Sequence, residues 1–92
     1  MDNKQTIQIR KIVGNFIKDL RENADPIILQ KEVAHWIGNE RTNYLRKENG
    51  KRPFSTEELL TIIVKFQKYY QKQTHLALDL TPLFDKIKSL TP

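Results

Sequence analysis

The sequence predicts a small all-α domain built from five helices. Three observations predict it: apolar residues recur every three or four positions, glycine and proline fall between these segments, and serine, threonine or aspartate stands where helices would begin. The chain has 92 residues, 38% hydrophobic and 29% charged, which suits one modest core and excludes a disordered chain. We therefore expect a single domain over residues 1–92, with a core over about 5–72 and a C-terminal helical extension over 73–92.

The first helix is expected over about residues 5–23, because its apolar residues form one stripe. Gly14 lies inside this helix and costs about 1 kcal/mol relative to alanine. We interpret it as a point of close helix contact. The stripe consists of Ile9, Ile12, Val13, Phe16, Ile17 and Leu20.

Two short helices are expected next, separated by a tight turn. The first covers residues 26–37 and begins at a proline, with Asp25 as its cap. Gly38 follows at the break, where a positive φ is needed. Asn39 is then expected to cap the second short helix, over about residues 40–48. Its side-chain oxygen would accept hydrogen bonds from the free amides of the first turn.

Two more helices are expected in the remaining chain. Ser55 and Glu58 form a capping box, which predicts a helix over about residues 56–72. Residues 73–80 are ambiguous, since their alternating leucines suit an extended connection but have no obvious strand to pair with. Thr81 is expected to cap the last helix. The apolar residues on one side of that helix are Leu83, Phe84, Ile87 and Leu90.

Charge and composition narrow the classes of function. The net charge is +5, and much of the excess lies between residues 41 and 52, which favours a polyanionic partner. The chain has no cysteine, which fits a reducing cytoplasm and excludes disulfides. No segment is long and apolar enough to suggest a membrane span or a signal peptide. His35 and His75 have no metal-type neighbours, and no nucleophile–base pair or cofactor motif is present, so we expect no metal, no cofactor and no enzyme.

The small residue, glycine turn and polar helix over residues 29–52 describe a helix-turn-helix whose second helix fits a DNA major groove. An arginine there can donate two parallel hydrogen bonds to guanine, and threonine can offer its methyl group to thymine. A solvated helix face is the alternative interpretation of the same charges. The residues expected on the outer face, as candidates for base readout, are Arg41, Thr42, Asn43 and Arg46.

Three short motifs in register carry a family resemblance. QKEVA at 30–34, IG at 37–38 and ENGKR at 48–52 resemble the phage-repressor-type helix-turn-helix proteins, the lambda-repressor-like or Xre/Cro-type family. The following segment, PFSTEELLTII, is similar to the fourth helix of that family. The resemblance covers roughly residues 17–68. It implies a five-helix lambda-repressor-like fold and binding to double-stranded DNA.

The resemblance also implies roles for individual residues. Arg41, Thr42 and Arg46 would point at base edges. Glu48 would be structural and would pair with Arg21 on the first helix. Phosphates would be held by Gln30, by the backbone amide of Asn49, and by Lys51 and Arg52.

Two residues depart from the family pattern. The position after the turn glycine is usually apolar and here is Asn39, and the position before the ENG motif is usually aliphatic and here is Lys47. We expect the packing to come from Tyr44 and Leu45, with the stem of Lys47 buried and its amine outside.

The sequence therefore predicts a sequence-specific DNA-binding protein, a small bacterial or phage transcriptional regulator of the repressor type. Because one module reads only a few base pairs, we expect a homodimer on a palindrome, formed by the fourth helix and residues 69–90. The alternative is a protein-interaction module on the same scaffold, such as an antitoxin or anti-repressor. Its partner would bind Trp36 and the C-terminal segment, and the departures at Asn39 and Lys47 mildly favour it.

Overall fold

The computed structural model describes residues 3–74 and 78–90, which form five helices and no strand. The all-α prediction with five helices is therefore confirmed for this part of the chain. The helices are α1 (Lys4–Glu22), α2 (Gln30–Trp36), α3 (Arg41–Glu48), α4 (Thr56–Thr74) and α5 (Thr81–Lys88).

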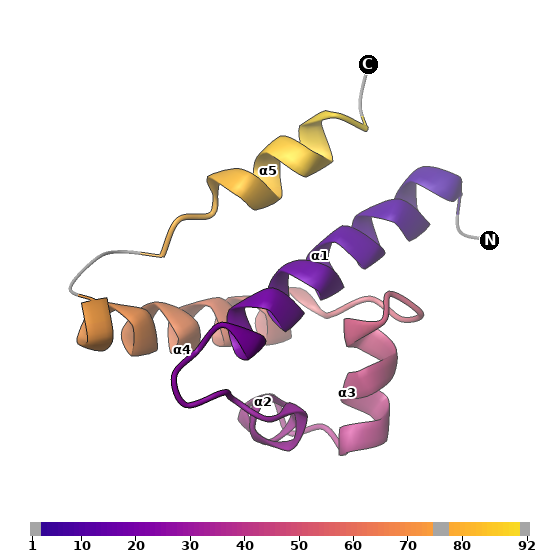
Figure 1. Ribbon diagram of the computed structural model, residues 1–92. Coiled ribbons are helices and arrows are strands. Elements are labelled where there is room, and N and C mark those ends of the chain that lie inside the picture. The colour runs from indigo at the N-terminus through magenta and orange to yellow at the C-terminus, as the bar shows by residue number, and fades with distance from the viewer. Residues whose placement is uncertain (1–2, 75–77, 91–92) are drawn as a thin grey trace.

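Helix α1 occupies the middle of the molecule (Figure 1). It contacts α3 through one side, and α5 packs along its other side, away from α2 and α3. Helix α2 contacts both α3 and α4. The C-terminal helix therefore leaves the outer face of α3 uncovered.

The core lies between α1, α2, α3 and α4. Trp36 packs edge-on against Phe66 of α4, with ring centroids 5.3 Å apart. Trp36, the last residue of α2, therefore packs on α4 of its own chain. The buried apolar residues of this cluster are Ile17, Ala24, Ile28, Val33, Ala34, Tyr44, Ile62 and Phe66.

Gly14 allows α1 and α3 to approach each other closely. A Cβ placed on this glycine would lie 2.0 Å from the carbonyl oxygen of Glu48, the last residue of α3. Backbone atoms cannot move aside as a flexible side chain can, so any side chain at this position would push the helices apart. The predicted close contact is thus present, and it fixes the depth at which α3 sits.

Helix α2 begins four residues later than predicted. Residues 26–29 are not helical, and the Asp25–Pro26 peptide bond is cis. Two hydrogen bonds outside the helical pattern hold the segment. The amide of Ile28 donates to the carbonyl of Arg21 at 3.1 Å, and the hydroxyl of Tyr69, 44 residues away in sequence, donates to the carbonyl of Asp25 at 2.6 Å. These tertiary bonds outweigh the local cap signal.

The caps of α3 and α5 also differ from the prediction. Glu40, not Asn39, stands at the cap position of α3, and it makes no side-chain cap bond. In α5, Leu80 stands at the cap position, while the side chain of Asp79 accepts from the amide of Thr81 at 2.9 Å. The hydrogen bonds of Asn39 explain the first correction and are described below.

The ends of α4 and α5 follow the sequence more closely. The capping box is confirmed, since Glu58 and Ser55 exchange hydrogen bonds of 2.9 and 3.1 Å. Of the ambiguous stretch, residues 73–74 continue α4 and residues 78–80 are irregular. Residues 75–77, which include His75, lie outside the described residues. Leu83 is buried, but Phe84 is 53% exposed, because neighbouring residues on a helix point in different directions and only one side of α5 meets α1.

Candidate nucleic-acid interface

Helix α3 has a buried inner face and an open outer face. Tyr44 and Glu48 are buried, whereas Arg41, Thr42 and Arg46 are exposed. A turn over residues 37–40 joins α3 to α2, and Gly38 in this turn has a φ of 67°, as predicted. The turn aims α3 so that its cationic side points away from the core.

A buried ion pair anchors the inner face of α3 to α1. Arg21 donates two hydrogen bonds to the carboxylate of Glu48, from Nε to Oε2 at 3.1 Å and from Nη2 to Oε1 at 2.9 Å. The hydroxyl of Tyr44 donates to the same carboxylate. Such a two-pronged arginine–carboxylate contact fixes orientation as well as distance. The structure thus places Arg21 and Glu48 in the structural pair that the resemblance implies.

The pKa values of this cluster follow from the same contacts. Burial raises the pKa of the Tyr44 phenol, and its hydrogen bond to Glu48 raises it further. Burial pushes the pKa of Arg21 down, but the hydrogen bond and the charge of Glu48 outweigh it, so the pKa is raised. Arg21 therefore stays ionised and the Tyr44 phenol neutral over the physiological range.

Gln30 connects the buried pair to the surface. Its Nε2 donates to Glu48 Oε1 at 3.3 Å, and its Oε1 accepts from Arg41 Nη2 at 3.2 Å. Arg41 is therefore held at the N-terminal end of α3 by a side chain of α2. The amide nitrogen of Gln30 retains one N–H beyond the bond to Glu48, so the residue can still donate to a phosphate.

The two residues that depart from the family pattern bind each other. Lys47 Nζ donates to Asn39 Oδ1 at 2.9 Å and lies 2.7 Å from Glu58 Oε2. Asn39 Nδ2 donates to the same Glu58 oxygen at 3.0 Å. The expectation that the Lys47 amine lies outside is wrong, because the side chain is only 12% exposed and its charge is neutralised by Glu58.

Asn43 belongs to this polar cluster more than to the exposed outer face of α3. It is half-buried, and its Nδ2 donates to Asn39 Oδ1 at 3.2 Å. The structure therefore separates Asn43 from the three exposed residues with which the sequence grouped it. Its amide helps to fix the turn before α3.

The loop after α3 is held by its backbone and leaves its basic side chains free to reach outward. The amide of Asn49 donates to the carbonyl of Leu45 at 3.0 Å, so the prediction that this amide holds a phosphate is wrong. Helix geometry is the reason, since this amide continues the bonding pattern of α3. The amides of Lys51 and Arg52 donate to the carbonyl of Arg46 at 2.9 and 3.3 Å, and both side chains are exposed.

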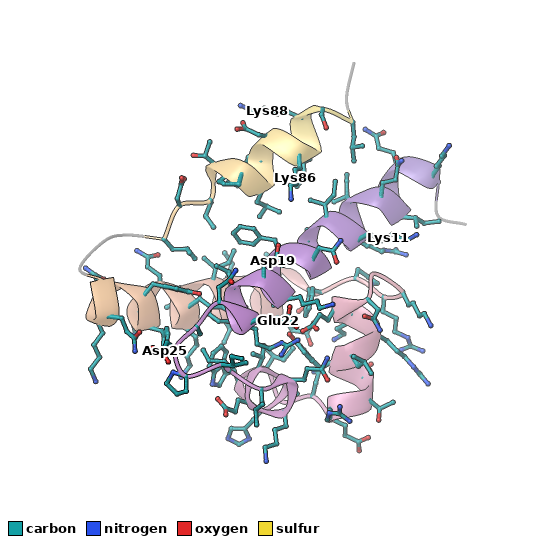
Figure 2. All side chains as sticks on the ribbon, in the orientation of Figure 1. Lys11, Asp19, Glu22, Asp25, Lys86 and Lys88 are labelled. Carbon is teal, nitrogen blue, oxygen red and sulfur yellow. The ribbon has the colours of Figure 1, made fainter. Side chains whose placement is uncertain are left out.

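Lys11 of α1 extends the basic surface, and the sequence did not reveal it. A Cβ placed on Gly50 would lie 2.6 Å from Lys11 Cγ, so α1 and the loop after α3 are in contact. Figure 2 shows Lys11 reaching from α1 on this side of the molecule. The only signal in the sequence was its position off the apolar stripe of α1, which does not distinguish one solvent face from another.

Arg46 and its neighbours border a shallow hollow beside α3. Its lining includes Thr42, Arg46 and Arg52, together with the turn residues Gly38 and Asn39. The side chain of Arg46 makes no hydrogen bond or ion pair with the part of the chain that the structure describes. Two arginines from different segments thus stand over one open, polar surface.

No protein-family model, curated protein or solved structure matches the chain. None of the helices in the described ranges is long and apolar enough to cross a bilayer. Within the same ranges, no group of three or more His, Cys, Asp and Glu residues is placed to hold a metal ion.

Proposed function

We propose that this protein binds double-stranded DNA in a sequence-specific manner, as a phage-repressor-type helix-turn-helix regulator. Helix α2 and the turn at residues 37–40 would support α3, which would enter the major groove. The observation that carries this proposal is the two-sided character of α3: Tyr44 and Glu48 fasten it from inside, while Arg41 and Arg46 stand exposed on the outside.

The exposed residues of α3 suit base readout. Arg41 lies in the first turn of the helix, and Arg46 lies five residues later, about 140° further round the axis and one turn after Thr42. Each guanidinium can donate two hydrogen bonds to O6 and N7 of a guanine, and Thr42 can contact a base with its methyl or hydroxyl group. Because Arg41 is oriented by Gln30, it reaches the DNA with less loss of side-chain freedom.

The surrounding cations suit phosphate contacts. Lys51 and Arg52 follow α3, and Lys11 adds a third positive charge from α1. Contacts of this kind supply affinity and orientation but little sequence information. The side chains of Asn49 and Gln30 would add neutral hydrogen bonds at the two ends of the unit.

A regulator of this size would act as a homodimer, because one α3 reads only a few base pairs. Tyr69 and Tyr70 hydrogen-bond to the carbonyls of Asp25 and Leu20, which uses them inside the fold. We therefore place the contact between copies on the outer face of α4, where Leu60 is 57% exposed.

The charges along α4 suit a second copy in antiparallel orientation. Leu60 and Val64 lie one turn apart on the outer face and are both exposed. Glu57 lies near the N-terminal end of this stripe and Lys68 near its C-terminal end. A two-fold axis between the two apolar residues would bring each Glu57 near Lys68 of the other copy, so that the surface complements itself.

The alternative, a protein-interaction module, has less support. Trp36, its expected contact residue, packs against Phe66. Asn39 and Lys47, which favoured it, form a hydrogen-bonded cluster with Glu58 that stabilises the turn and α3. Both features are explained by packing within the chain.

Selection of bound duplexes from a random DNA pool tests the proposal, followed by titration of the selected duplex and a scrambled duplex of equal length. We expect a preferred sequence with two-fold symmetry, bound at least a hundredfold more tightly than the scrambled duplex. Equal, micromolar or weaker binding to both would contradict the proposal and favour the alternative.

A further inference from the structure

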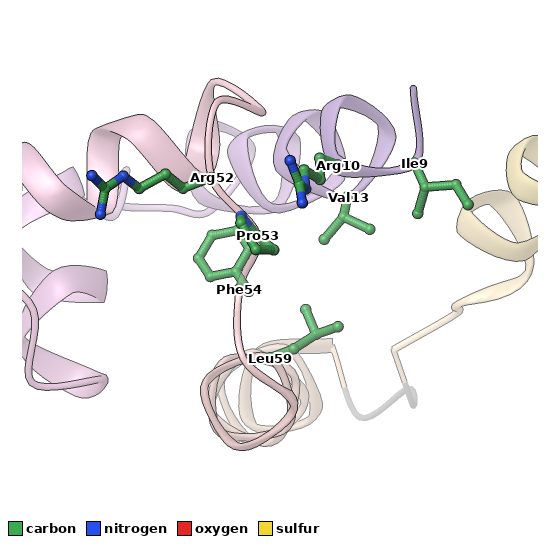
Figure 3. Close-up of a pocket in the computed structure, with 7 residues that line it drawn as sticks. All are labelled: Ile9, Arg10, Val13, Arg52, Pro53, Phe54 and Leu59. Atoms are coloured by element: carbon green, nitrogen blue, oxygen red, sulfur yellow. The ribbon is translucent and has the colours of Figure 1, made fainter. Parts of the chain in front are cut away.

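The two basic residues after α3 point to different sides of the molecule. Lys51 lines a hollow beside Lys11 of α1. Arg52 points its guanidinium toward α3 (Figure 3), and it lines the hollow that Thr42 and Arg46 border. Adjacent cations of one loop therefore serve different surfaces, and of the two only Arg52 shares a surface with the outer face of α3.

The backbone holds Arg52 close to Arg46. The amide of Arg52 donates to the carbonyl of Arg46 at 3.3 Å. Pro53 follows, and a proline disfavours helical conformations for the residue before it. Phe54 then packs against Tyr44 of α3, with ring centroids 6.0 Å apart. The loop is thus fastened to α3 on both sides of Arg52, and the two arginine side chains start from neighbouring backbone positions.

The described part of the chain leaves both guanidiniums available to a ligand. Neither Arg46 nor Arg52 makes a side-chain hydrogen bond or ion pair within residues 3–74 and 78–90. Among the described residues that line the hollow, Glu40 is the only acidic one, and it lies six residues before Arg46, about 9 Å along the axis of α3. Two like charges on one surface repel each other, so hydrogen-bond acceptors bound there would relieve the repulsion.

Guanine is the base that best matches two neighbouring arginines. In the major groove it presents two acceptors, O6 and N7, whereas adenine presents one acceptor and one donor, and cytosine presents a donor. A guanidinium can donate two parallel hydrogen bonds to the two guanine acceptors. Successive bases of one strand are about 3.4 Å apart along the axis, so neighbouring arginines can reach guanines in nearby base pairs.

We infer that Arg52 is a further specificity-determining residue, which contacts a guanine close to the one that Arg46 contacts. The inference rests on the proposed function, because it concerns the same bound DNA. It extends base readout from α3 to the loop that follows, and it separates Arg52 from Lys51, which stays a phosphate contact. A phosphate contact by Arg52 is the competing outcome of the test, since an exposed cation beside DNA also suits one.

The test compares the sequences that the wild-type, Arg52→Ala and Lys51→Ala proteins select from a random DNA pool. We expect a guanine in the wild-type half-site that Arg52→Ala no longer selects, while the other preferred bases are retained. Lys51→Ala removes the same charge from the adjacent residue and should select the wild-type sequence. Low salt keeps binding measurable when one cation is lost. Selection of the wild-type sequence by Arg52→Ala would overturn the inference.

Titration at one salt concentration gives the size of the effect. The selected duplex is compared with a duplex in which the G·C pair assigned to Arg52 is replaced by A·T. The wild-type protein should bind the altered duplex roughly 5- to 150-fold more weakly, whereas Arg52→Ala should bind both duplexes with the same affinity to within about twofold. If Arg52→Ala is weakened by the same factor on both duplexes, Arg52 contacts a phosphate and the inference is wrong.

A second variant covers the case in which Arg52→Ala does not fold. Arg52→Lys retains the charge but lacks the two-pronged donor geometry, so its preference for one guanine should fall at least fivefold. An unchanged selection by Arg52→Lys would overturn the inference.

Failure of the inference and failure of the proposed function give different results. If the wild-type protein selects no sequence, the proposed function fails and the inference fails with it. If the wild-type protein selects a sequence that both Arg52 variants also select, the inference alone fails.

Discussion

Lys47 and Asn39 are bound to each other, with the ammonium group of Lys47 donating to the amide oxygen of Asn39 at 2.9 Å. Both residues stand where the resembling family has apolar side chains. Glu58 joins them, accepting from Lys47 at 2.7 Å and from Asn39 at 3.0 Å. A satisfied polar cluster thus joins the turn, α3 and α4, and it is compatible with an outward-facing α3.

Asn39 and Lys47 should therefore be energetically coupled. Replacing either by alanine leaves the other with a lost partner in a partly buried site, which should cost about 1–3 kcal/mol of unfolding free energy. The double variant should lose less than the sum of the single losses, by about 0.5 kcal/mol or more. Urea denaturation gives the unfolding free energy of the wild-type protein, the two single variants and the double variant. Lys65→Ala, on the exposed side of α4, is the control. Strict additivity would show that the two side chains do not cooperate.

The stability contributed by Glu58 should depend on pH. Burial pushes the pKa of Glu58 up, but hydrogen bonds from Lys47, the amide of Ser55 and Asn39 outweigh burial, so the pKa is lowered. A lowered native-state pKa adds stability above the unfolded-state pKa of about 4.3, and this contribution is lost as pH falls through the native-state value.

The measurement is the difference in unfolding free energy between the wild-type protein and Glu58→Gln as a function of pH. We expect a constant difference between about pH 6 and pH 8 and a decreasing one from about pH 5 to pH 3. A difference that stays constant to pH 3 would mean that the carboxylate gains nothing from its charged partners.

Gly14→Ala should destabilise the protein, although helix propensity alone predicts a gain of about 1 kcal/mol. The added Cβ would lie 2.0 Å from the Glu48 carbonyl oxygen, so α1 and α3 would have to separate. We expect a loss of about 1–3 kcal/mol in thermal or urea unfolding. Asn15→Ala, one residue along α1 and exposed, is the matched control. A stabilised Gly14→Ala protein would show that the two helices are not in close contact.

Local chemistry was enough to predict most of the elements. Apolar spacing gave α1, and the reciprocal bonds of Ser55 and Glu58 gave the start of α4. The start of α2 was missed because Asp25–Pro26 is also a good turn. The hydrogen bond from Tyr69, 44 residues away in sequence, and the one that the Arg21 carbonyl accepts from Ile28 decide between the two. No local pattern reports such bonds.

In the candidate site too, some features follow from the local sequence and others depend on how the helices pack. The outward direction of Arg46 follows from the helical repeat of α3, whereas Arg41 is exposed in the first turn although it lies seven residues before the buried Glu48. The inward turn of Asn43 and the bond between Lys47 and Glu58 depend on how α3 meets α4. The position of Lys11 depends on how α1 meets the loop after α3, so it required coordinates.

Lys51 should contribute affinity without specificity. As an exposed cation after α3, it is placed for a phosphate contact, which is the same for every sequence. Lys51→Ala should weaken binding to selected and scrambled duplexes by the same factor and lower the slope of log affinity against log salt by about 1. Lys65→Ala, on α4, should leave both unchanged. A loss confined to the selected duplex would assign Lys51 to base readout instead.

Arg46 carries the central claim, because it is exposed on α3 and its side chain makes no hydrogen bond or ion pair within the described chain. The decisive measurement is the ratio of affinities for the selected and scrambled duplexes, compared between the wild-type protein and Arg46→Ala at one salt concentration. Loss of a guanine contact should reduce this ratio roughly 5- to 150-fold, equivalent to about 1–3 kcal/mol of discrimination, with Lys65→Ala as the control for a lost surface charge. An unchanged ratio for Arg46→Ala, in a protein that still folds and binds DNA, would contradict base readout by the outer face of α3.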